Sequence, residues 1–435
     1  MKRKLLSLAI IGIIISSNVI AQQHNSGKCA TMEVDKRMRE ENPEMGSLDE
    51  FEEWMAANMV DESYNAGKTN AVIYNIPVIV HVIHNGEAIG TNSNISDAQI
   101  QSQIVALNKD FTKTNSDWSN TPAVWTSRVA DCQINFFLTT LDQFGSPMPT
   151  PGIERINRTT MGWVAAPYSE TYVSQTIKPN SIWNPKLFLN IWVCNLGGVL
   201  LGYATFPPNS TLTGLFGPFG TSITDGVVVK YNCFGTTGNL LNGQDLGRTT
   251  THEIGHYLGI RHVWGDNTCA SDYCNDTPTQ FQENFGSPNF PSVSNCPGNA
   301  PNGDMFMNYM DYCDDNVAVM FTNNQKTRMH TALTKSPYRY LLIASTEEQV
   351  NIEKTLSIYP NPSNGLVNLN IELFNKSSME VKVYDILGNT FYTNTFDNNK
   401  MGKYTLDLTN VSNGIYFVEL RTGKETMTRK INILK

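Results

Sequence analysis

The sequence predicts an α+β domain followed by a smaller all-β domain. A β-branched run fills residues 71–83, and helical patterns alternate with short apolar runs as far as residue 343. After residue 355 short strands alternate with Gly-, Pro- and Asn-rich turns, a pattern typical of a β-sandwich. The chain has 435 residues, of which 40% are hydrophobic and 17% charged, so it can build two cores and is not a disordered chain.

The N-terminus has the pattern of an export signal. Basic residues at 2–4 precede an apolar run over 5–15, and small or branched residues at 19–21 offer a cleavage site. The apolar run is shorter than the roughly 20 residues of a membrane-spanning helix, which disfavours the alternative of a membrane anchor. We therefore expect residues 1–21 to be a signal peptide and the mature chain to pass through the periplasm, without a transmembrane span.

The next segment, residues 22–70, is polar and carries little core. Ser47 begins a helix there, with Leu48, Phe51 and Met55 at helical spacing. We interpret residues 22–70 as a propeptide; the alternative is an ordinary N-terminal extension. The net charge is −8, which leaves no basic surplus for phosphates and disfavours nucleic acid as a partner.

The main domain is expected over residues 71–345. After the first strand, the apolar patterns predict further strands at 134–138, 187–193 and 227–231 and helices at 97–110, 246–257 and 322–343. A long Asn-, Asp- and Pro-rich stretch, 264–310, has no periodicity, and loops of that length are usually functional or tied by disulfides or metal.

Residues 252–262 carry the pattern HExxHxxGxxH. His252 and His256 lie one helical turn apart and project from one face, as two nitrogen ligands of a zinc ion require. Glu253 can reach a water at the metal, and a glycine lets the chain turn so that His262 becomes the third ligand. Three protein ligands leave one position open, which is typical of catalytic zinc.

The flanking residues make this segment resemble the pappalysin family of metzincin metallopeptidases. The similar runs are NIWVCN at 190–195, LGRTT at 246–250, VWGD at 263–266, DTP at 276–278 and NYMDY at 308–312, the last resembling the methionine turn of the family. The resemblance implies a metzincin catalytic domain with a twisted mixed sheet, an active-site helix and an irregular C-terminal subdomain. It implies a secreted zinc endopeptidase that acts on proteins or peptides.

The resemblance also implies roles for single residues. Glu253 would activate a zinc-bound water as general base and then protonate the leaving amine. Met310 would form an apolar floor beneath the metal. Tyr312 would donate a hydrogen bond to the tetrahedral intermediate; the alternative is a packed core tyrosine. Strand 187–193 would lie near the substrate cleft and pair with an extended peptide.

Cysteines are expected to pair in an exported chain. The resemblance pairs Cys269 with Cys296. Cys274 with Cys313 is then the simplest further pair, although relatives place a cysteine a few residues after the position of Cys313. Cys194 either pairs with Cys233 or both are free.

Cys29 is the one cysteine of the predicted propeptide. A thiolate is a good zinc ligand, so Cys29 could hold the zymogen latent; the alternative is an inert thiol.

Calcium is expected as a second, structural metal. The polar loop after the histidine motif offers hard oxygen ligands, and pappalysin relatives bind calcium nearby. Asp276 is the single ligand we name; the alternative is a solvated loop tied by disulfides.

The methionine turn is followed by Asp311, Asp314 and Asp315, near the expected wall of the first primed subsite. A carboxylate there would favour Lys or Arg on the primed side of the cut. The alternative is that these carboxylates bind calcium or face solvent.

The last 80 or so residues, 355–435, resemble the C-terminal sorting domain of type IX secretion substrates. The similar runs are YPNPSNG at 359–365, VYDILG at 383–388, VSNGIY at 411–416 and KINILK at 430–435. The type IX machinery is the implied partner, with release or attachment at the outer cell surface; the alternative is an adhesion or carbohydrate-binding sandwich. For the whole chain the rival functions are an inactive surface adhesin and a zinc hydrolase of other substrates.

Overall fold

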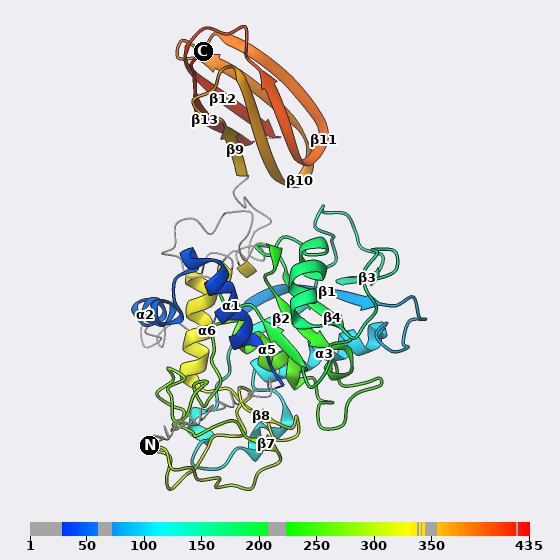
Figure 1. The fold of residues 1–435 in the computed structure, drawn as a ribbon, viewed down its shortest axis with the longest axis vertical. Helices are drawn as coiled ribbons and strands as arrows, with labels where there is room; N and C mark the ends of the chain where they lie inside the picture. Colours follow the sequence, from blue (N-terminus) through cyan, green and yellow to red (C-terminus); the bar gives the residue numbers. More distant parts are fainter. Residues whose placement is uncertain are drawn as a thin grey trace, which may run out of the picture.

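The computed structural model describes residues 28–59, 72–207, 223–336, 339–340, 342–343, 355–422 and 425–435. The predicted signal peptide, 1–21, lies outside these residues. Figure 1 shows an α+β body and an all-β body, as the sequence predicts.

The α+β body is built on a six-stranded mixed sheet. Its strands are β1 (Tyr74–His84), β2 (Ile134–Leu138), β3 (Ile153–Asn157), β4 (Leu189–Cys194), β5 (Gly202–Ala204) and β6 (Val227–Lys230). They run in the order β2-β1-β4-β6-β5, with β3 pairing the second half of β1; only β5 is antiparallel to its neighbour. The prediction that strand 187–193 pairs with substrate beside the cleft is therefore wrong. β4 lies inside the sheet between β1 and β6, and the edge strand is β5.

Helices cover the sheet and extend the body. They are α1 (Thr31–Glu41), α2 (Leu48–Asn58), α3 (Asp97–Phe111), α4 (Glu170–Tyr172), α5 (Arg248–Tyr257) and α6 (Asn323–Lys335). Side-chain caps begin four of them: Ser47 closes a capping box with Glu50 at α2, Ser96 caps α3, Ser169 caps α4, and Thr322 caps α6. In the predicted helix 322–343, α6 ends at Lys335, where Ser336 leaves the helical conformation.

The main core lies between one face of the sheet and α3 and α5. Alternate residues of β4 separate the two faces: Ile191 and Val193 join this core, whereas Trp192 and Cys194 face a second cluster on the other side. Ile254 carries α5 into the main core. The active-site helix is thus fixed to the sheet along its length.

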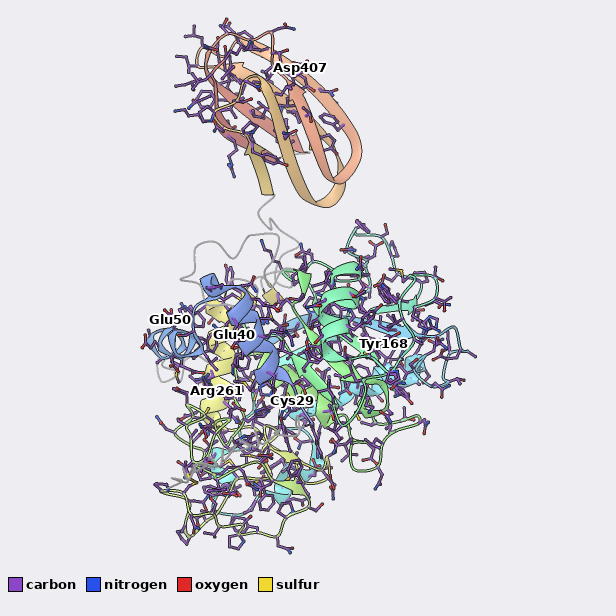
Figure 2. The ribbon with its side chains drawn as sticks, viewed as in Figure 1. Cys29, Glu40, Glu50, Tyr168, Arg261 and Asp407 are labelled. Atoms are coloured by element: carbon purple, nitrogen blue, oxygen red, sulfur yellow. A yellow bond between two sulfur atoms is a disulfide. The ribbon has the colours of Figure 1, made fainter. Side chains whose placement is uncertain are left out.

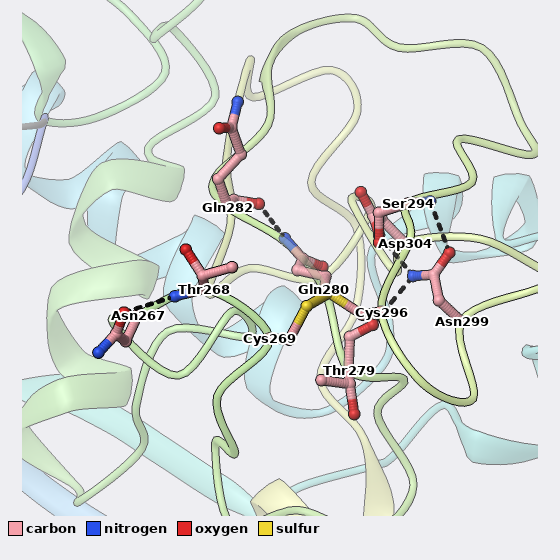
Figure 3. The surroundings of a disulfide bond; sticks show 10 residues. All are labelled: Asn267, Thr268, Cys269, Thr279, Gln280, Gln282, Ser294, Cys296, Asn299 and Asp304. Atoms are coloured by element: carbon pink, nitrogen blue, oxygen red, sulfur yellow. Dashed lines mark hydrogen bonds between the residues drawn. A yellow bond between two sulfur atoms is a disulfide. The ribbon is translucent and has the colours of Figure 1, made fainter.

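Below α5 the chain has little regular structure. Two short strands, β7 (Phe285–Gly286) and β8 (Tyr312–Cys313), pair within this part. The predicted disulfide between Cys269 and Cys296 is present (Figure 3). The predicted pair of Cys274 with Cys313 is wrong: both are free and buried, because Cys274 lies beside Asp272 and Arg328 while Cys313 is held in β8.

Of the two alternatives for Cys194 and Cys233, the structure has both thiols free. They lie in different clusters, Cys194 behind the sheet and Cys233 in the main core.

The all-β body contains β9 (Thr355–Tyr359), β10 (Leu366–Asp385), β11 (Thr390–Asp407), β12 (Gly414–Thr422) and β13 (Glu425–Ile433), all paired antiparallel. The sequence predicted more and shorter strands. The difference arises because β10 is one long strand whose pairing with β11 shifts register between Glu372 and Met379. In the sequence such an interruption looks like the gap between two short strands. No helix among the described residues is long and apolar enough to cross a membrane.

Candidate active site

Three histidines converge below the sheet. His252 and His256 project from α5, and their Nε2 atoms are 3.1 Å apart. The chain turns at Gly259, whose φ is +87°, and brings the Nε2 of His262 to 3.0 Å from that of His256. The three residues that the sequence singled out as ligands therefore form one cluster.

The remaining ring nitrogens fix the tautomers. Nδ1 of His252 donates to the carbonyl of Tyr309 and Nδ1 of His256 to that of Ile260, both at 2.7 Å, while Nδ1 of His262 faces the Asp266 carboxylate. With protons on Nδ1, the Nε2 atoms present bare lone pairs to one another.

These residues fit a zinc ion. Tetrahedral bonds of about 2.0–2.1 Å place ligand nitrogens about 3.3 Å apart, close to the separations seen here. Burial, with His262 nearby, lowers the pKa of His252 to about 3, so its imidazole is neutral at physiological pH. A metal cation satisfies all three facing lone pairs at once.

The Glu253 carboxylate is held by the start of the chain. The Cys29 thiol is 3.3 Å and the Thr31 hydroxyl 3.1 Å from its Oε2. Burial raises the pKa of Glu253 to about 8, opposed by these two hydrogen bonds. The Cys29 sulfur lies within 4.8 Å of the ligand nitrogens, at the N-terminal end of α1 (Figure 2).

Residues 28–30 lie along the free edge of β5. Leu201 N donates to the Lys28 carbonyl at 2.7 Å, and Ala30 N donates to the Gly202 carbonyl at 3.2 Å. The bridge between Cys29 and Gly202 is parallel. The edge strand β5 therefore forms backbone hydrogen bonds with an extended segment. From the sequence, this pairing is expected at strand 187–193 instead.

Tyr312 packs against the cluster from below. Its ring centroid lies 5.0 Å from that of His262, and its hydroxyl donates to the Cys29 carbonyl at 3.3 Å. The hydroxyl thus already donates to a backbone carbonyl of the segment that lies along β5.

Met310 lies directly under α5. A Cβ added at Gly255 would fall well inside van der Waals distance of the Met310 sulfur. Gly255 occupies one of the unspecified positions of the HExxHxxGxxH pattern, so the pattern did not indicate that helix α5 contacts the methionine turn at this residue.

Replacing Gly255 by Ala is expected to lower the free energy of unfolding by about 1–3 kcal/mol and to weaken metal retention, because the new methyl group pushes the methionine turn off the helix. Thermal unfolding and metal analysis of the purified variant measure both effects. Leu246→Ala, on an exposed side chain ahead of the same helix, is the control. Unchanged stability of the Gly255 variant would contradict the packing argument.

A pocket opens beside His252 and Glu253, and Lys28 enters it. The Lys28 ammonium donates to the Tyr312 carbonyl at 3.0 Å and lies 3.7 Å from Oδ1 of Asp314. The other two predicted carboxylates have structural partners: Asp315 accepts from the backbone ahead of α5, and Asp311 accepts from Gln280, Asn284 and Tyr312.

Asp276, the named calcium ligand, lies away from the histidines and anchors α6. Its carboxylate accepts from the Thr322 hydroxyl at 2.7 Å and from Asn324 N at 2.9 Å. Among the described residues, the three histidines with Cys29 are the one group of three or more His, Cys, Asp or Glu side chains that could converge on an ion.

Sequence reasoning missed Lys28 and Thr31, and it missed the contact of Asp266 with the His262 ring. Lys28 and Thr31 flank Cys29 closely, which is the signal that could have found them. Asp266 stands four residues after His262, a spacing that could have indicated its contact with the ring.

Comparison with known proteins places these residues in a family. A peptidase family model described as pregnancy-associated plasma protein-A matches residues 172–334. An extracellular metalloprotease of Verticillium alfalfae is 30% identical over 261 residues, which cover 60% of this chain and 76% of that protein. The chain belongs to the pappalysin family.

Solved pappalysin structures agree with this assignment. Mature mirolysin of Tannerella forsythia, in complex with a cleaved peptide, is 38% identical, with a TM-score of 0.56 over 65% of this chain and 100% of that one. A Tannerella forsythia promirolysin mutant is 34% identical, with a TM-score of 0.60 over 74% of this chain and 98% of that one. This pappalysin is a zinc metalloendopeptidase with the predicted metzincin fold.

The tail of this pappalysin matches a second model, described as a secretion system C-terminal sorting domain, over residues 357–434. Secretion or display at the cell surface follows, as the sequence predicts.

Proposed function

We propose that the chain is a latent endopeptidase precursor in which His252, His256 and His262 hold the catalytic zinc and Glu253 is the general base. One observation carries the proposal: three bare imidazole nitrogens and the Cys29 thiol meet beside the Glu253 carboxylate. Residues 22–70 are the propeptide in this proposal, residues 71–345 the peptidase domain and 355–435 the sorting domain.

In the activated enzyme, zinc held by the three histidines would act as a Lewis acid and would lower the pKa of a bound water molecule toward 7. Glu253, freed from Cys29 and Thr31, takes the proton from the attacking water and delivers it to the leaving amine. The Tyr312 hydroxyl, released from the Cys29 carbonyl, donates to the oxygen of the scissile carbonyl. The edge of β5 holds the substrate backbone, and Met310 supports the histidines from below.

Cleavage-site mapping tests this function. The activated protein is incubated with a peptide library, and the products are identified by mass spectrometry, with and without a zinc chelator. We expect cuts that disappear on chelation. A zinc-loaded protein without its propeptide that cuts nothing would favour the inactive adhesin, and turnover of other substrates alone would favour a different zinc hydrolase.

The first primed subsite is proposed to prefer Lys or Arg. Support comes from Lys28, which lines the pocket beside His252 together with Asp311 and Asp315. Its ammonium lies between the Tyr312 carbonyl and Asp314, which is next to that lining in the chain. A substrate cation in the same place would meet the same carboxylate.

Asp314→Asn is therefore expected to lower kcat/KM roughly tenfold for peptides with Lys or Arg at the first primed position, and to leave apolar peptides almost unchanged, because one charge-assisted contact is lost. Asp245→Asn, an exposed carboxylate just ahead of α5, is the matched control. An equal loss for both peptide classes would contradict the assignment of Asp314 to the subsite.

Calcium is proposed as a structural ion beside Asp276. Each oxygen of this carboxylate accepts one hydrogen bond and keeps a lone pair free. The other ligands would include backbone or amide oxygens, since Asp276 belongs to no group of three or more convergent His, Cys, Asp or Glu side chains among the described residues. Removing calcium with a selective chelator should lower the melting temperature without removing zinc; an unchanged melting temperature would contradict the proposal.

A further inference from the structure

The second helix of the proposed propeptide carries a buried carboxylate. Glu52, on α2, is 4% exposed and accepts from two arginines of the peptidase domain. Arg261 Nε lies 2.8 Å from its Oε1; Nη1 of Arg328 lies 2.8 Å from its Oε2 and Nη2 3.1 Å from its Oε1. Every strong donor around this carboxylate therefore comes from outside the propeptide.

The two arginines are built into the domain independently of Glu52. Arg328 is 1% exposed and donates from Nε and Nη2 to the Gly259 carbonyl, at 3.2 and 2.9 Å. The ring of Tyr273 lies 4.8 Å from the Arg261 guanidinium and 5.9 Å from that of Arg328. Two guanidiniums fixed side by side form a site for a carboxylate.

An apolar surface adjoins the pair. Phe51 and Met55 of α2 are fully buried and pack with Phe206 and Ala332 of the domain. Their side chains also reach Gly259, where an added Cβ would lie 3.1 Å from Met55 and 3.5 Å from Phe51. The site thus accepts a helix that presents a carboxylate between apolar side chains, and Figure 1 shows α2 lying beside α6.

This site is separate from the catalytic centre but joined to it by the backbone. Arg261 immediately precedes His262, and Arg328 holds the carbonyl of the glycine at which the histidine motif turns. Figure 2 places Arg261 on the α2 and α6 side of the body and Cys29 beside α1.

We propose that Arg261 and Arg328 form a carboxylate-binding exosite of the activated enzyme, and that its occupant is the α2 segment of the enzyme's own propeptide after cleavage. The inference rests on the proposed propeptide boundary. A cut after residue 59 breaks none of the described contacts of α2, so α2 can stay in place while Cys29 and Thr31 leave Glu253. Losing the occupant would break three charge-assisted hydrogen bonds and expose the apolar side chains of Phe51 and Met55, so the cleaved segment stays bound.

A labelled peptide of residues 46–59 tests the proposal. It keeps the Ser47–Glu50 capping box that begins α2 and lacks Cys29, so it cannot reach the metal site. Fluorescence anisotropy measures its affinity for the activated enzyme after the enzyme's own propeptide has been washed off at high salt, so that the exosite is vacant. We expect saturable binding that persists after zinc chelation and falls by a factor of about 30 or more in the Glu52→Gln peptide, because a buried charged partner is lost.

The Glu53→Gln peptide is the matched control, since Glu53 is the exposed neighbour on the same helix. Because the substitutions are made in the peptide, they cannot alter the folding of the enzyme. Equal binding of the Glu52→Gln and unaltered peptides, or no binding to an enzyme that cleaves substrates, would overturn the exosite. An enzyme that cleaves no peptide would instead count against the proposed function, while the anisotropy still decides on the exosite.

The full-length chain offers a second measurement. After nicking by an added protease between residues 60 and 70, the propeptide should co-elute with the remaining chain in the unaltered protein and in the Glu53→Gln variant. A larger fraction should be lost from the Glu52→Gln variant, although Arg37 of α1 still contacts Glu170. Equal retention in all three would overturn the proposal.

Discussion

Glu253→Gln is expected to lower kcat of the activated enzyme by a factor of about 10²–10⁴ while leaving bound zinc in place. The amide has the size of the carboxylate but cannot accept the proton of the attacking water. The three histidines keep their own second partners, the carbonyls of Tyr309 and Ile260 and the Asp266 carboxylate, so the metal site does not depend on Glu253.

Initial rates on a peptide identified by the library, together with metal analysis, check this expectation. Glu283→Gln, a partly exposed glutamate of the lower subdomain, is the matched control. A variant that loses zinc along with activity would show a structural role for Glu253. A variant that keeps full activity would remove the general base from the mechanism.

The zinc cluster could be predicted because its geometry is local. Helical spacing places His252 and His256 on one face, and the glycine turn brings His262 back within a few residues, so no long-range packing has to be known. The disulfide between Cys269 and Cys296 could be predicted from the family resemblance. It too is local, because both cysteines belong to one loop segment.

Contacts across the sheet could not be predicted in this way. The sequence shows that residues 187–193 form an apolar strand, but not whether that strand is internal or at an edge. The edge belongs to the three residues of β5, too short to give a periodic signal. Their position depends on antiparallel pairing with β6, which only the folded sheet defines.

The same limit applies to charged groups. Asp311, Asp314 and Asp315 look alike along the chain, yet Asp311 and Asp315 accept from backbone and amide donors, whereas Asp314 forms an ion pair with Lys28. The pairing of Glu52 with Arg261 and Arg328 joins residues more than 200 positions apart. Such contacts follow from the packing of α2 and leave no pattern in the sequence.

Cys29→Ala is expected to shorten the lifetime of the intact precursor by a factor of about ten or more. Of the His, Cys, Asp and Glu side chains described in the proposed propeptide, only the Cys29 thiol groups with the three histidines, within 4.8 Å of their nitrogens. An alanine leaves that position open to water. A loss of only 1.4 kcal/mol in the free energy that holds the latent state already gives a tenfold change in the active fraction.

The rest of the propeptide stays anchored in this variant, so the expected change is in access rather than in fold. Arg37 keeps two bonds of 2.7 Å to Glu170, and Glu52 keeps its two arginines. Latency should therefore fail gradually, as molecules with an accessible metal site cut the propeptides of their neighbours. A time course of purified precursor on a denaturing gel measures this rate.

Two further variants distinguish loss of the Cys29 thiol from general destabilisation and from cleavage by another protease. Cys194→Ala, another free and buried thiol, removes a sulfur behind the sheet and should leave the lifetime unchanged. The double variant Cys29→Ala with Glu253→Ala should remain intact, because self-cleavage needs the general base. If the double variant is processed as fast as the single one, the cut comes from a contaminating protease. If Cys29→Ala is as long-lived as the unaltered precursor, the thiol does not hold the enzyme latent, and the hydroxyl of Thr31 on Glu253 becomes the contact to remove next.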